Sequence, residues 1–297
     1  MLSLQLKLIF SIFALLFALE SVAEIIEIVD DLGRPLRLQA PAKRIISLAP
    51  HITENLFAAG AGDLIIGAVS YSDFPEQARV IPQVGSYNNL NIELILALHP
   101  DLIVGWKEGN QKQQVEQLID LGLTVYINAP VKLADIARNI QDFGILTGNE
   151  HSANKASIAF TDRLNSLREK YSEKKAISVF YQTWHKPLLT VNDQQFIGRI
   201  LTLCGGKNIF ADLSTLTPRV NIEAVLSRNP RAIIASGMGE ARPEWLDTWR
   251  KWPSLNATRH DNLFFVPPDI IQRSTPRLLD GAQLVCEYLQ QVRDNKE

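Results

Sequence analysis

The chain has 297 residues, of which 46% are hydrophobic and 21% are charged. This composition excludes a disordered or fibrous protein, and the length favours about two globular domains. Thirty basic and thirty-two acidic side chains leave a net charge of −2, so the chain lacks the overall positive field of a nucleic-acid-binding protein.

Residues 1–23 have the layout of a secretory signal peptide. Lys7 carries a positive charge, residues 8–19 are apolar and uncharged, and the small residues Ser21 and Ala23 occupy the −3 and −1 positions of a cleavage site. The apolar run is too short to cross a bilayer comfortably. We therefore expect an exported protein whose signal peptide is cleaved, and the alternative is an uncleaved N-terminal anchor.

Strand-like and helix-like segments alternate through residues 43–150, which we expect to form one α/β lobe. The expected strands are 45–48, 64–68, 102–104 and 123–127. The expected helices are 52–59, a short one after Asn91, 110–121 and 132–144. Such alternation is typical of parallel βαβ units. The preceding segment, residues 24–42, is expected to contain a small hairpin over 28–38.

One long helix is expected within residues 151–172. The stretch 152–170 has no proline or glycine, and Phe160, Leu164 and Leu167 lie at helical spacing. A helix of about twenty residues spans ~30 Å, so it would join two lobes stiffly.

Residues 173–297 repeat the alternation and are expected to form a second α/β lobe. The expected strands are 176–181, 232–235 and 263–266. The expected helices are 194–203, a short one after Asn221, 243–250 and 276–292. The alternation again indicates parallel βαβ units.

The two halves also share a sequence repeat. Residues 91–105 read NIELILALHPDLIVG, and residues 221–237 read NIEAVLSRNPRAIIASG. In each, the asparagine is a suitable N-cap, and the glutamate lies in the first helical turn, where negative charge is favoured. A proline then ends the helix and an apolar strand follows. The repeat predicts two Rossmann-like α/β lobes, which the one long rigid helix would join.

Cys204 and Cys286 are the two cysteines of the chain. Two cysteines are too few for a four-cysteine zinc site. In an exported protein they can form a disulfide, which would close a long loop and stabilise the fold by roughly 4 kcal/mol in the chain-entropy model. We expect this disulfide, and the alternative is two buried thiols that never meet.

Four motifs follow one another in an order that resembles the cobalamin/iron-siderophore class of periplasmic substrate-binding proteins. They read KRIISLAPHITENLFAAGAGDLIIGAVSYSDFP, NIELILALHPDLIVGW, LCGGKNIF and VPPDIIQRSTPRLLDGAQLV. The likeness covers nearly all of residues 43–294 and is greatest to the vitamin B12 binders of the class. It implies a monomeric periplasmic clamp of two lobes around a transported ligand, with no cofactor and no catalytic residue.

The resemblance also implies a partner. In this class a glutamate on each lobe docks on arginines of the transmembrane subunits of an ABC importer. The matching residues are Glu93 and Glu223, the glutamates of the repeat. Two carboxylates related by internal symmetry suit a two-fold symmetric partner, on which charge pairs steer encounter and fix register. The alternative is that each glutamate only stabilises the start of its helix.

The resemblance places the ligand, cobalamin or a related corrinoid, between the lobes at the carboxyl ends of the strands. Tyr71 matches a corrin-contacting tyrosine of the class. Flat aromatic faces suit a large planar macrocycle, whereas the alternative for any one aromatic is core packing. The expected ligand-binding residues are Tyr71, Tyr87, Trp106, Trp184, Asp269, Ile270, Ile271, Gln272 and Arg273.

The chain departs from the vitamin B12 binders at aromatic positions. Ile270 and Ile271 stand where two aromatics are found in that group, and Pro218 stands at or beside a third. These departures leave haem or a ferric siderophore open as the ligand. Siderophore binders tend to line the cleft with several arginines, and Arg273 is the one arginine that the resemblance places there, which favours cobalamin.

An exported enzyme is the alternative of a different class. The chain has no GxSxG, HExxH, Walker or CxxC motif. Its five histidines are scattered without ligand-like spacing, so we expect no metal site. His51 follows the first strand and is the residue that would serve an enzyme in the cleft, against a capping or ligand-contact role.

Overall fold

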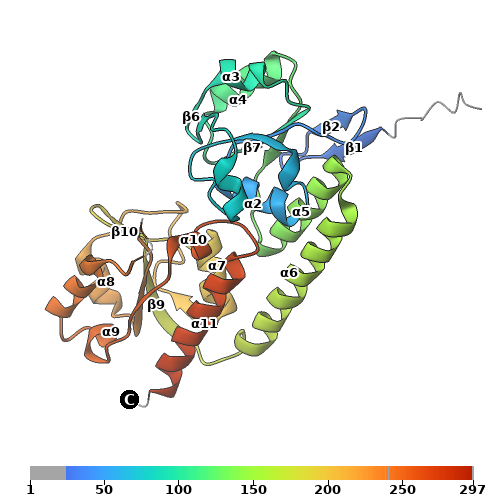
Figure 1. Ribbon diagram of the computed structural model, residues 1–297. Helices are drawn as coiled ribbons and strands as arrows, with labels where there is room; N and C mark the ends of the chain where they lie inside the picture. The colour runs from blue at the N-terminus through green and yellow to red at the C-terminus, as the bar shows by residue number, and fades with distance from the viewer. Residues whose placement is uncertain (1–24, 238, 240, 296–297) are drawn as a thin grey trace, which may run out of the picture.

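The computed structural model describes residues 25–237, 239 and 241–295, so the predicted signal peptide, residues 1–23, lies outside the described residues. Figure 1 shows two lobes, the N-terminal one at the upper right and the C-terminal one at the lower left. The helix α6 (Glu150–Tyr171) runs along one side of both, and it is the long helix predicted over 152–170. No helix in the described part of the chain is long and apolar enough to cross a membrane.

The first lobe is built on a parallel sheet of four strands in the order β4-β3-β7-β8. Its strands are β3 (Ile45–Ser47), β4 (Ile65–Ala68), β7 (Leu102–Trp106) and β8 (Val125–Asn128). Its helices are α2 (Pro50–Ala58), α3 (Ile92–Ala97), α4 (Lys112–Asp120) and α5 (Leu133–Thr147), with the 3-10 segments η1 (Gly62–Leu64) and η2 (Glu76–Val80). Two hairpins complete it, β1 (Ile26–Val29) with β2 (Pro35–Leu38), and β5 (Gly85–Ser86) with β6 (Asn89–Leu90).

The second lobe is built on a parallel sheet of four strands in the order β12-β9-β13-β14. Its strands are β9 (Ile177–Gln182), β12 (Gly206–Asn208), β13 (Ala232–Ala235) and β14 (Leu263–Phe265). A small hairpin joins β10 (Trp184–His185) to β11 (Leu188–Leu189). Its helices are α7 (Phe196–Leu203), α8 (Ile222–Arg228), α9 (Asn256–Arg259), α10 (Pro268–Ile271) and α11 (Leu278–Asp294), with the 3-10 segment η3 (Glu244–Lys251).

The two sheets have the same topology. In each one, the second strand along the chain lies at an edge, followed across the sheet by the first, the third and the fourth. The helices of the sequence repeat, α3 and α8, precede the equivalent strands β7 and β13. Their predicted N-caps are present, because Asn91 Oδ1 accepts from the backbone N–H of Leu94 at 3.0 Å and Asn221 Oδ1 accepts from that of Ala224 at 2.8 Å. The predicted two-lobed α/β fold is confirmed.

One hydrophobic core runs through both lobes. Alternate residues of each strand point to opposite faces of its sheet, so Ile45 and Ile46 of β3 belong to different clusters. The cluster of Ile45 continues across α5, α6, α7 and α11 into the second sheet, where it includes Val179 of β9. The outer faces of the two sheets have separate clusters. A shared core of this kind makes the junction between the lobes stiff, because closely packed interiors do not deform continuously.

Three local features differ from the sequence predictions. Residues 244–251 form a 3-10 segment rather than an α-helix: Pro243 and Pro253 bracket it, and i→i+3 bonds such as Leu246 N–H to the Pro243 carbonyl hold it. Between the predicted strand 263–266 and the predicted helix 276–292 lies the short helix α10, which was not predicted and which Pro268 begins at its first position. Strand β12 is not predicted, because its residues Gly-Lys-Asn are not an apolar run.

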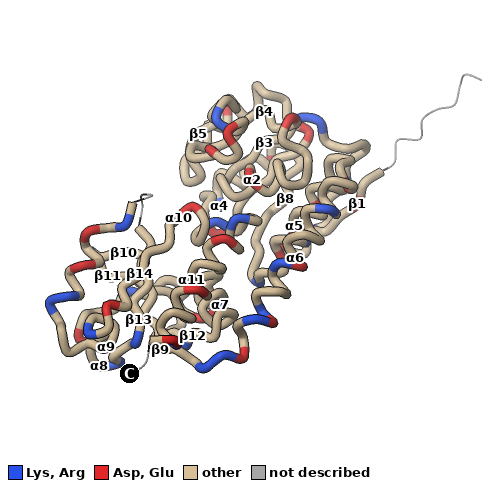
Figure 2. The backbone as a smooth tube through the Cα atoms, turned by 60° about the horizontal axis from the view of Figure 1, so that its bottom comes forward, with Lys and Arg blue, Asp and Glu red and all other residues tan. Residues whose placement is uncertain are grey.

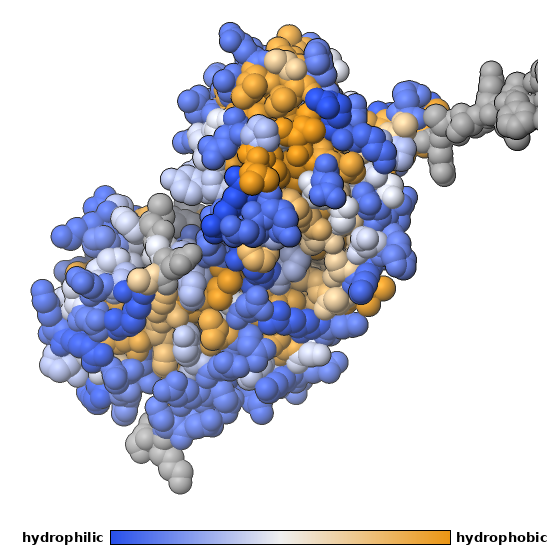
Figure 3. All heavy atoms as spheres, in the orientation of Figure 1, coloured by the Kyte–Doolittle hydropathy of each residue, from blue (hydrophilic) through white to orange (hydrophobic). Residues whose placement is uncertain are grey.

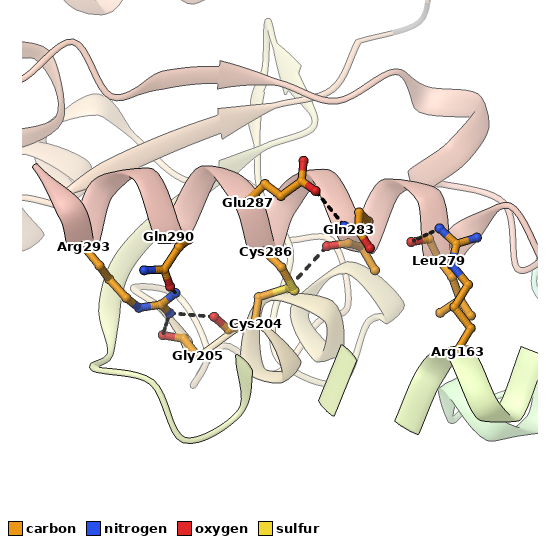
Figure 4. The surroundings of a disulfide bond; sticks show 10 residues. Arg163, Cys204, Gly205, Leu279, Gln283, Cys286, Glu287, Gln290 and Arg293 are labelled. Carbon is orange, nitrogen blue, oxygen red and sulfur yellow. Dashed lines mark hydrogen bonds between the residues drawn. A yellow bond between two sulfur atoms is a disulfide. The ribbon is translucent and has the colours of Figure 1, made fainter. Parts of the chain in front are cut away.

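The structure joins Cys204 to Cys286 by a disulfide, as predicted. The bridge ties the end of α7 to the middle of α11, and both cysteines are fully buried (Figure 4). Two arginines beside it fasten α11 further. Arg293 donates to the carbonyls of Cys204 and Gly205 at 2.7 and 3.2 Å, and Arg163 of α6 donates to the Leu279 carbonyl at 3.3 Å.

Candidate functional site

The first lobe places an aromatic group at the carboxyl ends of its strands. Trp106 is the last residue of β7, and its ring centroid lies 5.8 Å from that of Tyr87 and 5.1 Å from that of His51. Tyr71 follows β4 in the left-handed region at φ 65°, and it is 72% exposed. Such exposure of a large aromatic side chain, held in a conformation that non-glycine residues seldom adopt, is typical of a binding surface. The structure thus brings Tyr87 and Trp106 together.

The buried Asn110 fixes this aromatic group and was not predicted. Its Nδ2 donates to the carbonyls of Leu48, at 2.8 Å, and of Tyr87, at 2.6 Å. Its Oδ1 accepts from the backbone N–H of Trp106 at 2.6 Å. One amide therefore ties the end of β3, the β5–β6 turn and the end of β7 together, so the positions of the two rings are set by the backbone around them.

His51 is buried at the start of α2 and is held as a neutral ring. Its Nε2 lies 3.1 Å from Oδ1 of Asn128, and because an amide oxygen only accepts, Nε2 carries the proton. The pKa of His51 is lowered to about 4. Burial is the main cause and the nearby charge of Arg273 adds to it, whereas the hydrogen bond to Asn128 acts in the opposite direction. The ring meets Trp106 edge to face, with an interplanar angle of 80°. The neutral His51 ring, held by its bond to Asn128, therefore packs against Trp106 and supports the position of that ring.

Arg273 lies at the centre of an ion-pair cluster that joins the two lobes. Its Nη1 lies 2.9 Å from Glu54 Oε1 and 2.9 Å from Asp73 Oδ1, and its Nη2 lies 3.2 Å from Asp269 Oδ1. Arg277 donates from Nε and Nη2 to the two oxygens of Glu54, at 3.0 and 2.7 Å. Figure 2 shows acidic and basic residues side by side near α10, and Figure 3 shows hydrophilic side chains where the lobes meet. We call these five side chains the junction cluster.

The centre of the junction cluster is shielded from water, whereas its outer carboxylates Asp73 and Asp269 are 42% and 35% exposed. The Glu54 side chain is 2% exposed and that of Arg273 is 15% exposed. Burial opposes the charge on Arg273, but the bonds to Asp73 and Glu54 outweigh this effect and raise its pKa. Asn55 adds a further link between the lobes, since its Nδ2 donates to the carbonyl of Ser274 at 2.9 Å. The guanidinium of Arg273 is therefore engaged by carboxylates, which leaves little of it to bind a ligand.

A cavity of about 510 Å³ lies beside the junction cluster. Both lobes line it, with Glu54, Phe57 and Phe74 on one side and Pro276 and Arg277 on the other. The guanidinium carbon of Arg277 lies 3.7 Å from the centroid of the Phe74 ring, which closes one wall. None of the predicted ligand-binding residues lines this cavity, so it is distinct from the aromatic group around Trp106.

The second lobe carries a second aromatic group, which the sequence predicted only in part. Trp184 of β10 lies 5.0 Å from His185, measured between ring centroids, and His185 stacks on Trp245 at 5.4 Å with an interplanar angle of 13°. His185 and Trp245 were not predicted. Trp245 lies in η3, well beyond the end of β13, so no signal in the sequence marked it.

The remaining predicted contacts lie around α10. Ile271 is fully buried in the shared core and presents no surface to a ligand. Its neighbour Ile270 is partly buried and also packs on the core. Gln272 donates to Ser236 Oγ at 2.7 Å and so ties α10 to the end of β13, and Asp269 pairs with Arg273.

Glu93 and Glu223 lie at equivalent places, each in the first turn of its repeat helix and exposed. Neither makes an ion pair with another residue in the part of the chain that the structure describes. Among those residues there is also no group of three histidine, cysteine, aspartate or glutamate side chains that could hold a metal ion.

Comparison with known proteins shows which family has this architecture. The family described as "Periplasmic binding protein" matches residues 45–270. The chain belongs to the periplasmic binding protein family. A vitamin B12-binding protein of Vibrio cholerae serotype O1 is 40% identical over 250 residues, which cover 84% of this chain and 90% of that relative.

Solved structures agree with the fold. The periplasmic vitamin B12-binding protein of Vibrio cholerae matches with a TM-score of 0.79 at 38% identity, over 86% of this chain and 99% of that one. A periplasmic haem-binding protein from Roseiflexus sp. RS-1 matches with a TM-score of 0.73 at 19% identity, over 84% of this chain and 99% of that one, and this likeness shows the fold alone. The predicted membership of the periplasmic substrate-binding proteins is confirmed.

Proposed function

We propose that this chain captures cobalamin between its two lobes in the periplasm and delivers it to an ABC importer. The observation that carries the proposal is the aromatic group of Tyr87, Trp106 and the exposed Tyr71, in a chain 40% identical to a vitamin B12-binding protein. A corrin ring is broad and flat, and aromatic side chains offer apolar area to such a ligand at little entropic cost. The chain acts as a monomer and has no catalytic residue.

Delivery requires export, which the signal-like residues 1–23 provide. Cleavage after Ala23 leaves a mature protein of residues 24–297. The disulfide between Cys204 and Cys286 fits an oxidising compartment, since disulfides persist outside the reducing cytoplasm.

The ion pairs of Arg273 favour cobalamin over a ferric siderophore. An anionic siderophore would need free cations in the cleft, and Arg273 is already engaged by Glu54, Asp73 and Asp269. The amide-rimmed, largely apolar surface of a corrinoid needs no free cation and suits aromatic walls instead.

Isothermal titration of the mature protein with cyanocobalamin tests the ligand. We expect one-to-one binding with Kd at or below micromolar, about −8 kcal/mol or more favourable. Haem and an anionic ferric siderophore serve as parallel controls. Binding heat with either control and none with cyanocobalamin would show that the ligand is haem or a ferric siderophore, and would contradict the proposal.

Glu93 and Glu223 are the proposed docking residues for the importer. Reversing both to arginine should abolish cobalamin uptake, because like charges would then face the arginines of the transmembrane subunits. Uptake of labelled cyanocobalamin by cells is the measurement. Titration of the same variant should give an unchanged Kd, since both side chains lie exposed in the first turns of their helices and contact none of the predicted ligand-binding residues in the described part of the chain. A matched reversal of the exposed Glu116 to arginine should leave uptake intact. Normal uptake by the double variant would remove the docking role.

A further inference from the structure

We propose that the N-terminal hairpin of β1 and β2 belongs to the ligand site. Asp31, in the turn of this hairpin, is a positioning residue that acts through Asn128 and His51 on the ring of Trp106. We call Asp31, Asn128 and His51 the buried relay. The inference deepens the proposed function and rests on it, because the ring that the relay holds is one of the proposed ligand contacts.

The turn of the hairpin is bonded to the carboxyl end of β8. Figure 1 shows β1 and β2 on the side of the first lobe that lies away from the second lobe. The backbone N–H of Asp31 donates to the carbonyl of Ile127 at 3.2 Å, and Asp31 Oδ2 accepts from the backbone N–H of Ala129 at 2.6 Å. The next residue, Leu32, is 44% exposed, yet the Asp31 side chain is only 1% exposed. A carboxylate buried in a surface turn is costly, so its partners have to compensate it.

Donors from α5 and β8 surround the carboxylate of Asp31. Arg138 donates to Oδ1 at 2.7 Å, and Asn139 donates from Nδ2 to both oxygens at 3.0 Å. Asn128 donates from Nδ2 to Oδ2 at 3.3 Å. A carboxylate only accepts hydrogen bonds, so Asp31 draws the amino group of the Asn128 amide toward itself and leaves the amide oxygen on the other side. Asp31 therefore sets the orientation of the Asn128 side chain.

The amide oxygen of Asn128 links this orientation to the aromatic group. Asn128 is the register partner of Trp106 in the parallel pair of β7 and β8, so the two side chains lie on the same face of the sheet. Asn128 Oδ1 accepts from His51 Nε2 at 3.1 Å, and the centroid of the His51 ring lies 5.1 Å from that of Trp106. Both Asn128 and His51 are buried, so each bond of the relay is made between protein groups in a poorly hydrated place.

Loss of Asp31 loosens the aromatic group without removing an aromatic side chain. Without the carboxylate, either end of the Asn128 amide can face the hairpin, and His51 loses the acceptor that fixes its ring. Trp106 then samples more positions before the ligand arrives, and part of the free energy of binding goes into ordering it. The hairpin thereby influences affinity through the residues behind Trp106.

A double-mutant cycle tests the relay by titration of the mature protein with cyanocobalamin. We expect Asp31→Ala to raise Kd by about fivefold, as for residues coupled through one hydrogen-bond network. In a His51→Ala background the same substitution should change Kd by less than about twofold, because the relay is already broken. A residue that only stabilised the fold would change Kd equally in both backgrounds.

Asp30 supplies the matched control. It is the neighbouring aspartate of the same turn, and its buried side chain pairs with Arg34 at 2.7 Å. Its other hydrogen bonds go to backbone N–H groups of the hairpin and of β8, and none goes to Asn128 or His51 in the described part of the chain. Asp30→Asn keeps an oxygen for the turn and should leave Kd within about twofold of wild type.

A second measurement needs no ligand. Trp106 gives an indole N–H signal in the NMR spectrum of the isotope-labelled protein, and the loss of this signal in Trp106→Phe assigns it. The signal should shift in Asp31→Ala, because the ring current of His51 at Trp106 changes with the orientation of the His51 ring. The signal of Trp249, whose Nε1 donates to Gln182 in the second lobe at 2.7 Å, should stay in place and serves as the internal reference.

Thermal unfolding shows whether each variant is folded. Where Asp31→Ala is not, Asn128→Leu takes its place in both measurements, with the same expected results. It breaks the same chain of contacts and leaves the ion pair of Asp31 with Arg138 intact.

The relay is overturned by an unshifted Trp106 signal, by an unchanged Kd, or by an equal rise of Kd in the two backgrounds. An Asp30→Asn variant that binds as weakly as Asp31→Ala would also overturn it, since the stability of the hairpin would then explain both losses. A wild-type protein that gives no heat with cyanocobalamin would contradict the proposed function instead, and the Trp106 signal would still decide the relay.

Discussion

Replacing both Cys204 and Cys286 by alanine should lower the free energy of unfolding by about 4 kcal/mol. The two cysteines are 82 residues apart in the sequence, and a bridge over so long a loop removes much conformational freedom from the unfolded chain. The bridge joins α7 to α11, two elements that pack in the core shared by both lobes. Urea unfolding of the mature wild type and the double variant under oxidising conditions measures the difference.

The wild-type protein in reductant is the matched control for this variant. Reduction should bring the wild type down to about the stability of the double alanine variant, and reductant should not affect the variant itself. Ligand affinity at a temperature where the variant is folded should be unchanged, because the disulfide lies in the core and not among the aromatic residues. A loss below about 1 kcal/mol would show that the unfolded chain is already compact around the bridge.

Much of the fold can be predicted from the sequence because the signals that define it are local. Apolar runs at the period of a strand and amphipathic runs at the period of a helix repeat along the chain, and the Asn-Ile-Glu stretches mark the same unit twice. The strands that were not predicted are short and contain polar residues. An example is β12, which pairs with β9, a strand from a distant part of the chain. Their pairing is set by neighbouring strands and not by their own composition.

The candidate site could be predicted only where a side chain directly follows a strand. Trp106 is the last residue of β7 and Tyr71 lies in the turn after β4, and the family resemblance marked both as ligand contacts. The surroundings of Arg273 carry no such signal, because its partners Glu54 and Asp73 precede it by 219 and 200 residues. The burial of Ile271 could not be predicted for a similar reason, since it follows from packing against α11 and the shared core. Contacts between segments that are distant in the sequence leave no local signal, so they become visible only in the folded structure.

Replacing Glu54 by glutamine should lower the free energy of unfolding by about 3 kcal/mol. Glu54 is the carboxylate that both Arg273 and Arg277 share, and its side chain is 2% exposed. Without the Glu54 charge, Arg277 is left in a poorly hydrated place with no carboxylate partner among the described residues, which costs more than the pair contributed, while Arg273 keeps Asp73 and Asp269. The loss should lie at the lower end of the usual range, because Arg273 and Arg277 are 15% and 21% exposed and water can reach them in part.

A matched exposed pair separates this effect from simple loss of charge. Glu76 lies 3.4 Å from Arg79 with its side chain 78% exposed, so Glu76→Gln should change the free energy of unfolding by no more than about 0.5 kcal/mol. Equal stability of Glu54→Gln and wild type in urea unfolding would show that the arginines find other partners.

The same substitution should also weaken cyanocobalamin binding at temperatures where the variant is folded. Glu54 belongs to the first lobe and its two arginines to the second, so the ion pairs hold the aromatic residues of the two lobes at one separation. Without them, part of the free energy of binding goes into ordering the lobes, and Kd rises. Titration of Glu54→Gln beside Glu76→Gln measures this. An unchanged Kd together with a lowered stability would mean that the shared hydrophobic core alone fixes the lobes, and that the junction cluster stabilises the fold without arranging the site.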